Sequence, residues 1–81
     1  MIYLTKEKYL YVRPVKLTRQ EEKLLFMLAS NEVLTYEEMK EKGLDRVAAS
    51  ALKSRLIDDT GLKITSVKGV GYRLDDNIWF M

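Results

Sequence analysis

The sequence predicts an α+β fold in which a short N-terminal antiparallel sheet precedes three helices and a C-terminal β-hairpin. Thr18 and Thr35 each begin a T-x-x-E capping motif, which marks the start of a helix. Between Val67 and Leu74, β-forming residues surround two glycines, as in a tight hairpin. The 81 residues suffice for one small core, so we expect a single domain spanning 1–81.

The first 17 residues are expected to form the sheet. Residues 2–4 and 9–12 are rich in β-formers and flank a polar run, which predicts a β-hairpin. Arg13-Pro14 predicts a second turn, followed by a third short strand over 15–17.

Helices are expected over about 19–30, 36–42 and 46–59, within the segment 18–59. Gly43 ends the second helix and Asp45 caps the third, which leaves a three-residue turn typical of a helix-turn-helix. Residues 62–75 should form the hairpin and 76–81 a tail. The expected core joins four helical leucines to three hairpin residues: Leu25, Leu28, Leu52, Leu56, Val67, Tyr72 and Leu74.

A helical wheel separates the third helix into two faces. The core stripe contains Asp45, Ala48, Ala49, Leu52 and Leu56, and the opposite side contains Arg46, Val47, Ser50, Lys53, Ser54 and Ile57. The second face suits a DNA groove, because arginine and serine bond base edges or phosphates and valine contacts a thymine methyl. Lys53 would follow the DNA backbone, and Lys68 would reach the minor groove or a phosphate. For the third helix and for the hairpin that carries Lys68, the alternative is an ordinary solvated surface.

Composition excludes several classes of site. The chain has no cysteine and no histidine, so thiol chemistry, the usual zinc ligands and imidazole catalysis are absent. We expect no enzyme activity, no catalytic residue, no metal and no cofactor. The N-terminus lacks a signal-peptide pattern and no apolar run is long enough to span a membrane, so a cytoplasmic location is expected. Residues 40–74 hold eight basic and four acidic side chains, a mild excess that favours an anionic partner.

Four stretches of the chain resemble the DNA-binding effector domain of OmpR/PhoB-type response regulators. They are Leu17-Thr18-x-x-Glu21 with Leu24-Leu25-x-x-Leu28-Ala29-x-Asn31, then Thr35-x-Glu37-Glu38-Met39, then Val47-x-x-Ser50-x-Leu52-Lys53-x-Arg55-Leu56, and finally Ile64 to Leu74. The resemblance covers residues 17–74 and implies a winged helix-turn-helix, with the hairpin as the wing.

The resemblance also implies a function, namely sequence-specific binding of double-stranded DNA that regulates transcription in bacterial two-component signalling. By position it implies base contacts from Arg46, Val47, Ser50, Ala51 and Ser54, a minor-groove contact from Lys68, and phosphate contacts near Thr35 and Tyr36. RNA polymerase is a further partner that it suggests. A second copy on tandem half-sites is expected for a different reason, because only Arg46 on this face could form a two-bond contact with a base. Because the family normally carries a receiver domain, we expect either a fragment or a small stand-alone regulator.

A second interpretation is a winged helix that binds protein, such as RNA polymerase or another regulator, with little DNA binding. The low cationic excess and the alanines of the third helix favour it. The apolar tail, Ile78 to Phe80, would either join two copies or fold back onto the domain's own core.

Overall fold

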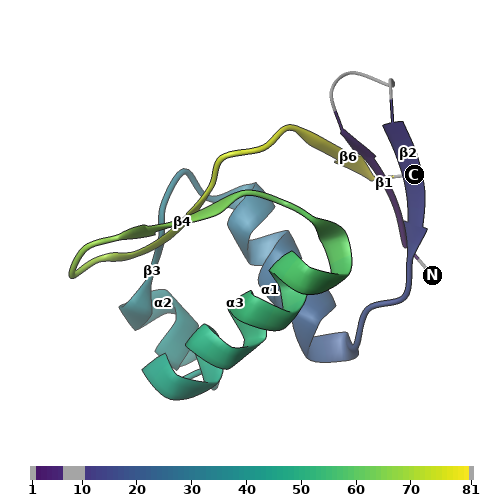
Figure 1. Cartoon of the computed structure of the whole chain (residues 1–81). Coiled ribbons are helices and arrows are strands. Elements are labelled where there is room, and N and C mark those ends of the chain that lie inside the picture. Colours follow the sequence, from purple (N-terminus) through teal and green to yellow (C-terminus); the bar gives the residue numbers. More distant parts are fainter. Residues whose placement is uncertain (1, 7–10, 81) are drawn as a thin grey trace.

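The structure, a computed structural model, describes residues 2–6 and 11–80 and is α+β (Figure 1). Within these residues there are three helices and two small antiparallel sheets. The helices are α1 (Arg19–Ser30), α2 (Tyr36–Glu41) and α3 (Arg46–Thr60). The strands are β1 (Ile2–Lys6), β2 (Tyr11–Val15), β3 (Leu34–Thr35), β4 (Ile64–Val67), β5 (Gly71–Leu74) and β6 (Ile78–Phe80).

The N-terminal sheet has the order β2-β1-β6. Its β1–β2 hairpin is confirmed, although Tyr9 and Leu10 of the second predicted strand lie outside the described residues. The predicted turn at Arg13-Pro14 is wrong, because both residues belong to β2 and Pro14 pairs with Tyr3. Proline fits there because β2 is an edge strand, where a missing N–H breaks no ladder.

The third strand of this sheet is not at residues 15–17, as predicted. Val15 ends β2, and the third strand is β6, in which Phe80 pairs with Leu4. The segment expected to be a tail therefore folds back onto β1. Residues 78–80 thus have a place within the chain's own N-terminal sheet.

All three helices begin at the predicted caps. The Thr18 hydroxyl accepts from the Glu21 N–H at 3.2 Å, and the Glu21 carboxylate accepts in return from the Thr18 N–H. Burial raises the pKa of Glu21, and a hydrogen bond with Asp59 acts in the same direction. At α3, the Asp45 carboxylate accepts from the Ala48 N–H at 2.7 Å. The helix starts are thus fixed by local side-chain bonds.

The helix ends differ slightly from the prediction. α2 ends at Glu41 with Lys42 as its cap, so four residues, 42–45, join α2 to α3. α3 continues to Thr60, whose hydroxyl donates to the Leu56 carbonyl at 2.5 Å. Gly61 then ends the helix in the left-handed conformation, at φ 71°.

The core confirms most of the predicted apolar contacts. The four helical leucines and Tyr72 are buried, whereas Val67 and Leu74 are only partly buried. The buried apolar residues are Leu24, Leu25, Leu28, Leu34, Met39, Leu44, Ala49, Leu52, Leu56, Leu62 and Tyr72. Asp45 and Ala48 were expected in the core stripe but are exposed. A helical wheel gives the direction of a side chain but not whether another element covers that turn.

The second sheet has the order β3-β5-β4 and attaches the hairpin to the helices. Leu34 pairs with Tyr72 and Thr35 with Gly71, directly before α2 begins. A Cβ atom on Gly71 would lie 1.9 Å from the Leu34 carbonyl oxygen, so only glycine allows this approach. Figure 1 shows the hairpin projecting beside α2 and α3, away from the N-terminal sheet.

Candidate nucleic-acid interface

Most of the predicted outer face of α3 is open to solvent, whereas Lys53 and Ile57 on that face are partly buried. Val47 is 81% exposed, far more than Phe26 and Val70, the other exposed large apolar side chains among those that the structure describes. Ser50, Ala51 and Ser54 are also exposed, because Ala49, Leu52 and Leu56 turn towards the core. The exposed face therefore consists mainly of small side chains, which allow another surface to approach the helix closely.

Lys53, predicted to follow a DNA backbone, contacts the hairpin in this structure. Its ammonium group donates to the Ser66 hydroxyl at 3.2 Å and lies 4.8 Å from the centroid of the Tyr72 ring. A cation–π contact near the surface contributes about 0.5–1 kcal/mol. Lys53 thus fixes the hairpin against α3.

Arg46 and Tyr36 form a second contact, between the first turns of α3 and α2. The guanidinium carbon lies over the Tyr36 ring, 4.1 Å from its centroid. Tyr36 meets Tyr72 edge to face, with centroids 5.6 Å apart and an interplanar angle of 75°. Burial, chiefly, raises the pKa of Tyr72, and a hydrogen bond with Ser50 acts in the opposite direction. Arg46 and Lys53, both from α3, therefore lie against the two rings of an aromatic pair, and this pair joins α2 to the hairpin.

Sequence reasoning missed Tyr72 and Ser66 as parts of this arrangement. The alternation of apolar and polar residues in the hairpin predicted Tyr72 as a core residue only and gave Ser66 no role. Their contacts depend on how the hairpin lies against α3, and no local spacing reports that geometry.

The tip of the hairpin presents Lys68 to solvent. The Val70 N–H donates to the Val67 carbonyl at 2.9 Å, and Gly69 supplies φ 74° at the third position of this turn. Lys68 therefore occupies the second position of this turn. The Val70 carbonyl in turn accepts from the Tyr36 N–H at 2.9 Å, which connects the tip to the start of α2.

A shallow hollow lies where these elements meet. Its lining brings together Thr35, Tyr36, Glu37, Arg46, Gly69 and Val70. The Thr35 hydroxyl accepts from the Glu38 N–H at 3.1 Å, so this oxygen caps α2 while its own proton can still be donated. The structure therefore groups Thr35, Tyr36 and Arg46 with the hairpin turn, whereas Ser54 lies two turns further along α3.

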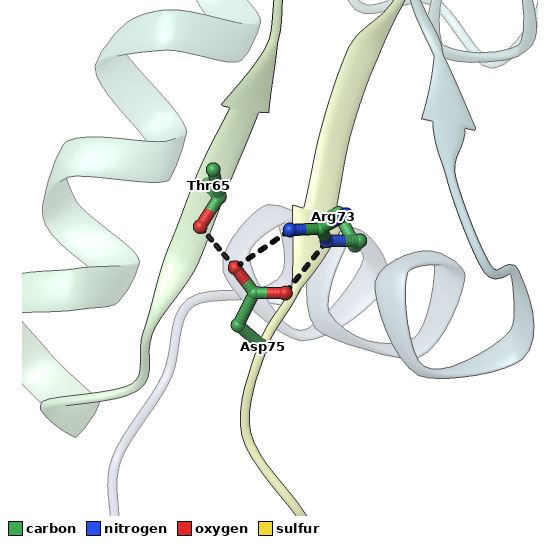
Figure 2. A network of polar contacts seen from close by, with 3 residues as sticks. All are labelled: Thr65, Arg73 and Asp75. Atoms are coloured by element: carbon green, nitrogen blue, oxygen red, sulfur yellow. Dashed lines mark hydrogen bonds and ion pairs between the residues drawn. The ribbon is translucent and has the colours of Figure 1, made fainter.

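Arg73 is paired within the chain and is not a free cation of the hairpin. Its Nε atom lies 2.6 Å from an Asp75 carboxylate oxygen, and the Thr65 hydroxyl donates to the same carboxylate (Figure 2). The hydrogen bond to Arg73 is the main cause that holds the pKa of Asp75 below its ordinary value of 3.8. These contacts link β4, β5 and the segment after β5 at the base of the hairpin.

The Asp75 titration tests this contact. In Arg73→Gln the pKa of Asp75 should rise towards 3.8, because the charged hydrogen bond is lost. A pKa lowered by folding stabilises the chain above the unfolded value, and the contribution disappears as the pH falls through the folded pKa. Carboxyl NMR titration measures the change, with Lys68→Gln as the control. An unchanged Asp75 pKa in Arg73→Gln would contradict the pairing.

Among residues 2–6 and 11–80, no group of three acidic, cysteine or histidine side chains is placed to hold a metal ion. No helix in those residues is long and apolar enough to cross a membrane. Comparison with known proteins finds no matching family model, no matching curated protein and no matching solved structure.

Proposed function

We propose that this chain is a winged helix-turn-helix that binds double-stranded DNA and regulates transcription. In this proposal α3 enters the major groove, and the β4–β5 hairpin, the wing, contacts the minor groove or backbone. The observation that carries the proposal is the fixed pairing of two exposed surfaces. The open face of α3 and the tip carrying Lys68 are joined through Lys53, Tyr72 and Tyr36.

The shape and charge of these surfaces support the proposal. Small residues along α3 permit close approach to the floor of a groove about 12 Å wide. Arg46 at the start of α3 and Lys68 at the tip are exposed cations on the two elements. The resemblance to OmpR/PhoB-type effector domains agrees with this interpretation. It extends the proposal to bacterial two-component regulation in the cytoplasm, with RNA polymerase and tandem copies on DNA as partners and no enzymatic role.

Binding to a protein is the second candidate function. Val47 and Val70, 81% and 43% exposed, are apolar side chains on α3 and the wing. Apolar residues at the centre of a patch are typical of protein interfaces. Salt separates the two functions, because phosphate contacts make affinity fall steeply with salt concentration and an apolar interface does not.

The wing gives the most direct test of DNA binding. Lys68→Ala should weaken binding to all duplexes about equally and lower the slope of log affinity against log salt by about one, since one phosphate contact is lost. Fluorescence anisotropy with labelled duplexes over a salt series measures both quantities. Lys16→Ala is the matched control, because Lys16 is an exposed cation in the segment joining β2 to α1.

Each outcome has a definite meaning. Absence of salt-dependent binding by the wild-type chain would sink the DNA proposal and favour the protein-binding alternative. Binding that is equally insensitive to both lysine substitutions would remove the wing from the interface while leaving α3 in place.

A further inference from the structure

We infer that Tyr36 positions the Arg46 guanidinium to recognise guanine in the major groove. This inference rests on the proposed DNA-binding function and adds to it a base and a positioning residue. Guanine offers two acceptors in that groove, O6 and N7, and arginine meets both with a pair of N–H groups. Such a pair forms only if the guanidinium is held in one orientation.

Tyr36, over whose ring Arg46 lies, is itself held by two contacts. The Tyr36 N–H donates to the Val70 carbonyl at 2.9 Å, and the Tyr36 ring meets the buried Tyr72 ring at 5.6 Å. The guanidinium carbon of Arg46 lies 4.1 Å from the centroid of this ring. An arginine side chain is flexible in solution, so a rigid aromatic surface lowers the entropy lost when it binds.

The donors of Arg46 are not used by the protein in the described part of the chain. Glu37 and Asp45 line a second, neighbouring hollow together with Arg46, yet neither forms an ion pair with it. A guanidinium lying on a ring directs its N–H groups outward, where they remain available. The next residue, Val47, is 81% exposed, so this end of α3 is not covered by protein.

The rest of the face explains why Arg46 would determine specificity. Val47, Ser50, Ala51 and Ser54 are small, and Lys53 is engaged by Ser66 and Tyr72. None of these small side chains can form a two-bond contact with a purine edge. A contact of Arg46 with a phosphate instead would make binding indifferent to the base.

Substitution of single guanines tests the inference. A preferred duplex is first selected from a random library, and each guanine is then replaced by 7-deazaguanine, which lacks the N7 acceptor. At one position this replacement should lower the affinity of the wild-type chain about tenfold, which is the effect of losing part of a bidentate contact. At that position Arg46→Ala should show no loss. Tyr36→Phe should keep the wild-type loss, whereas Tyr36→Leu should reduce it.

For each variant, the decisive quantity is the ratio of its affinity for the guanine duplex to its affinity for the 7-deazaguanine duplex, because a purely structural defect would weaken binding to both duplexes alike. A second measurement keeps an aromatic ring at position 36. In the free protein, the NMR signals of the Arg46 side chain should be shifted by the ring current in wild type and in Tyr36→Phe. Thermal melts establish which variants fold.

Failure of the inference and failure of the proposed function are distinguishable. Binding to no duplex, even at low salt, would overturn both. Binding without a position sensitive to both 7-deazaguanine and Arg46→Ala would overturn the inference alone. A folded Tyr36→Leu with the full discrimination ratio, or unshifted Arg46 signals in Tyr36→Phe, would overturn the positioning role.

Discussion

Gly71→Ala is expected to destabilise the chain by about 1–3 kcal/mol or more, because the added methyl has no room. The new Cβ atom would lie 1.9 Å from the Leu34 carbonyl oxygen and 2.9 Å from the Thr35 Cα atom. Both neighbours are backbone atoms, which cannot rotate away as a side chain does. Relief requires β5 to separate from β3, and the hairpin would then lose its attachment to the start of α2.

Gly69→Asn is the matched control for this substitution. Gly69 lies in the same hairpin at φ 74°, a left-handed conformation that asparagine tolerates. Within the described part of the chain, and apart from Gly69 and its two chain neighbours, no atom lies within 4 Å of the place that its Cβ atom would take. Urea unfolding should give a near wild-type midpoint for Gly69→Asn and a clearly lower one for Gly71→Ala. Equal midpoints for the two variants would show that β3 does not approach β5 so closely.

Leu56→Ala should have an effect of comparable or larger size, about 2–5 kcal/mol. Leu56 has no exposed surface and belongs to the face of α3 that packs on the core. The cost combines lost transfer free energy with the cavity left behind. A chain of 81 residues has a total stability of roughly 4–12 kcal/mol, so this single change removes a large share of it.

Ser54→Ala separates this packing effect from a general effect on the helix. Ser54 is exposed on the opposite face of α3, where substitution changes stability by about 0.5 kcal/mol or less. Thermal unfolding should place Leu56→Ala at least about 8 °C below wild type and Ser54→Ala close to it. A Leu56→Ala melt within a couple of degrees of wild type would mean that the assigned face of α3 is wrong.

The helices could be predicted because their determinants are local. Thr18 with Glu21 and Asp45 with Ala48 are three residues apart, so the sequence itself displays both partners of each cap. The apolar spacing of α1 and α3 then identified core positions of these two helices, but not the buried Leu34, Met39, Leu44 and Leu62. Ala48 was misplaced because its exposure depends on which neighbouring element covers the first turn of α3.

The strands were harder to predict because their partners are distant. β3 contains two residues and exists only through its pairing with Tyr72 and Gly71. Pro14 suggested a turn, yet it lies in β2, where the edge position removes the usual penalty. β6 is defined by β1 at the opposite end of the sequence, and no local pattern indicates which strand an apolar segment will join.

The candidate interface was predicted as a set of residues but not as an arrangement. The wheel placed Arg46, Val47 and Ser50 on the exposed side, as the structure has them. It could not show that Lys53 binds Ser66 or that Arg46 lies over Tyr36, because those partners belong to other elements. Long cationic side chains find partners inside the protein that a one-dimensional pattern does not contain.

The order β2-β1-β6 has a consequence for synthesis of the chain on the ribosome. β1 is the central strand of its sheet, but its second partner is translated only after all three helices. Until Ile78 to Phe80 emerge, β1 keeps one edge of unpaired N–H and C=O groups, and such an edge is a template for pairing with other chains. A nascent chain paused before β6 would therefore expose the unpaired edge of β1 to other chains.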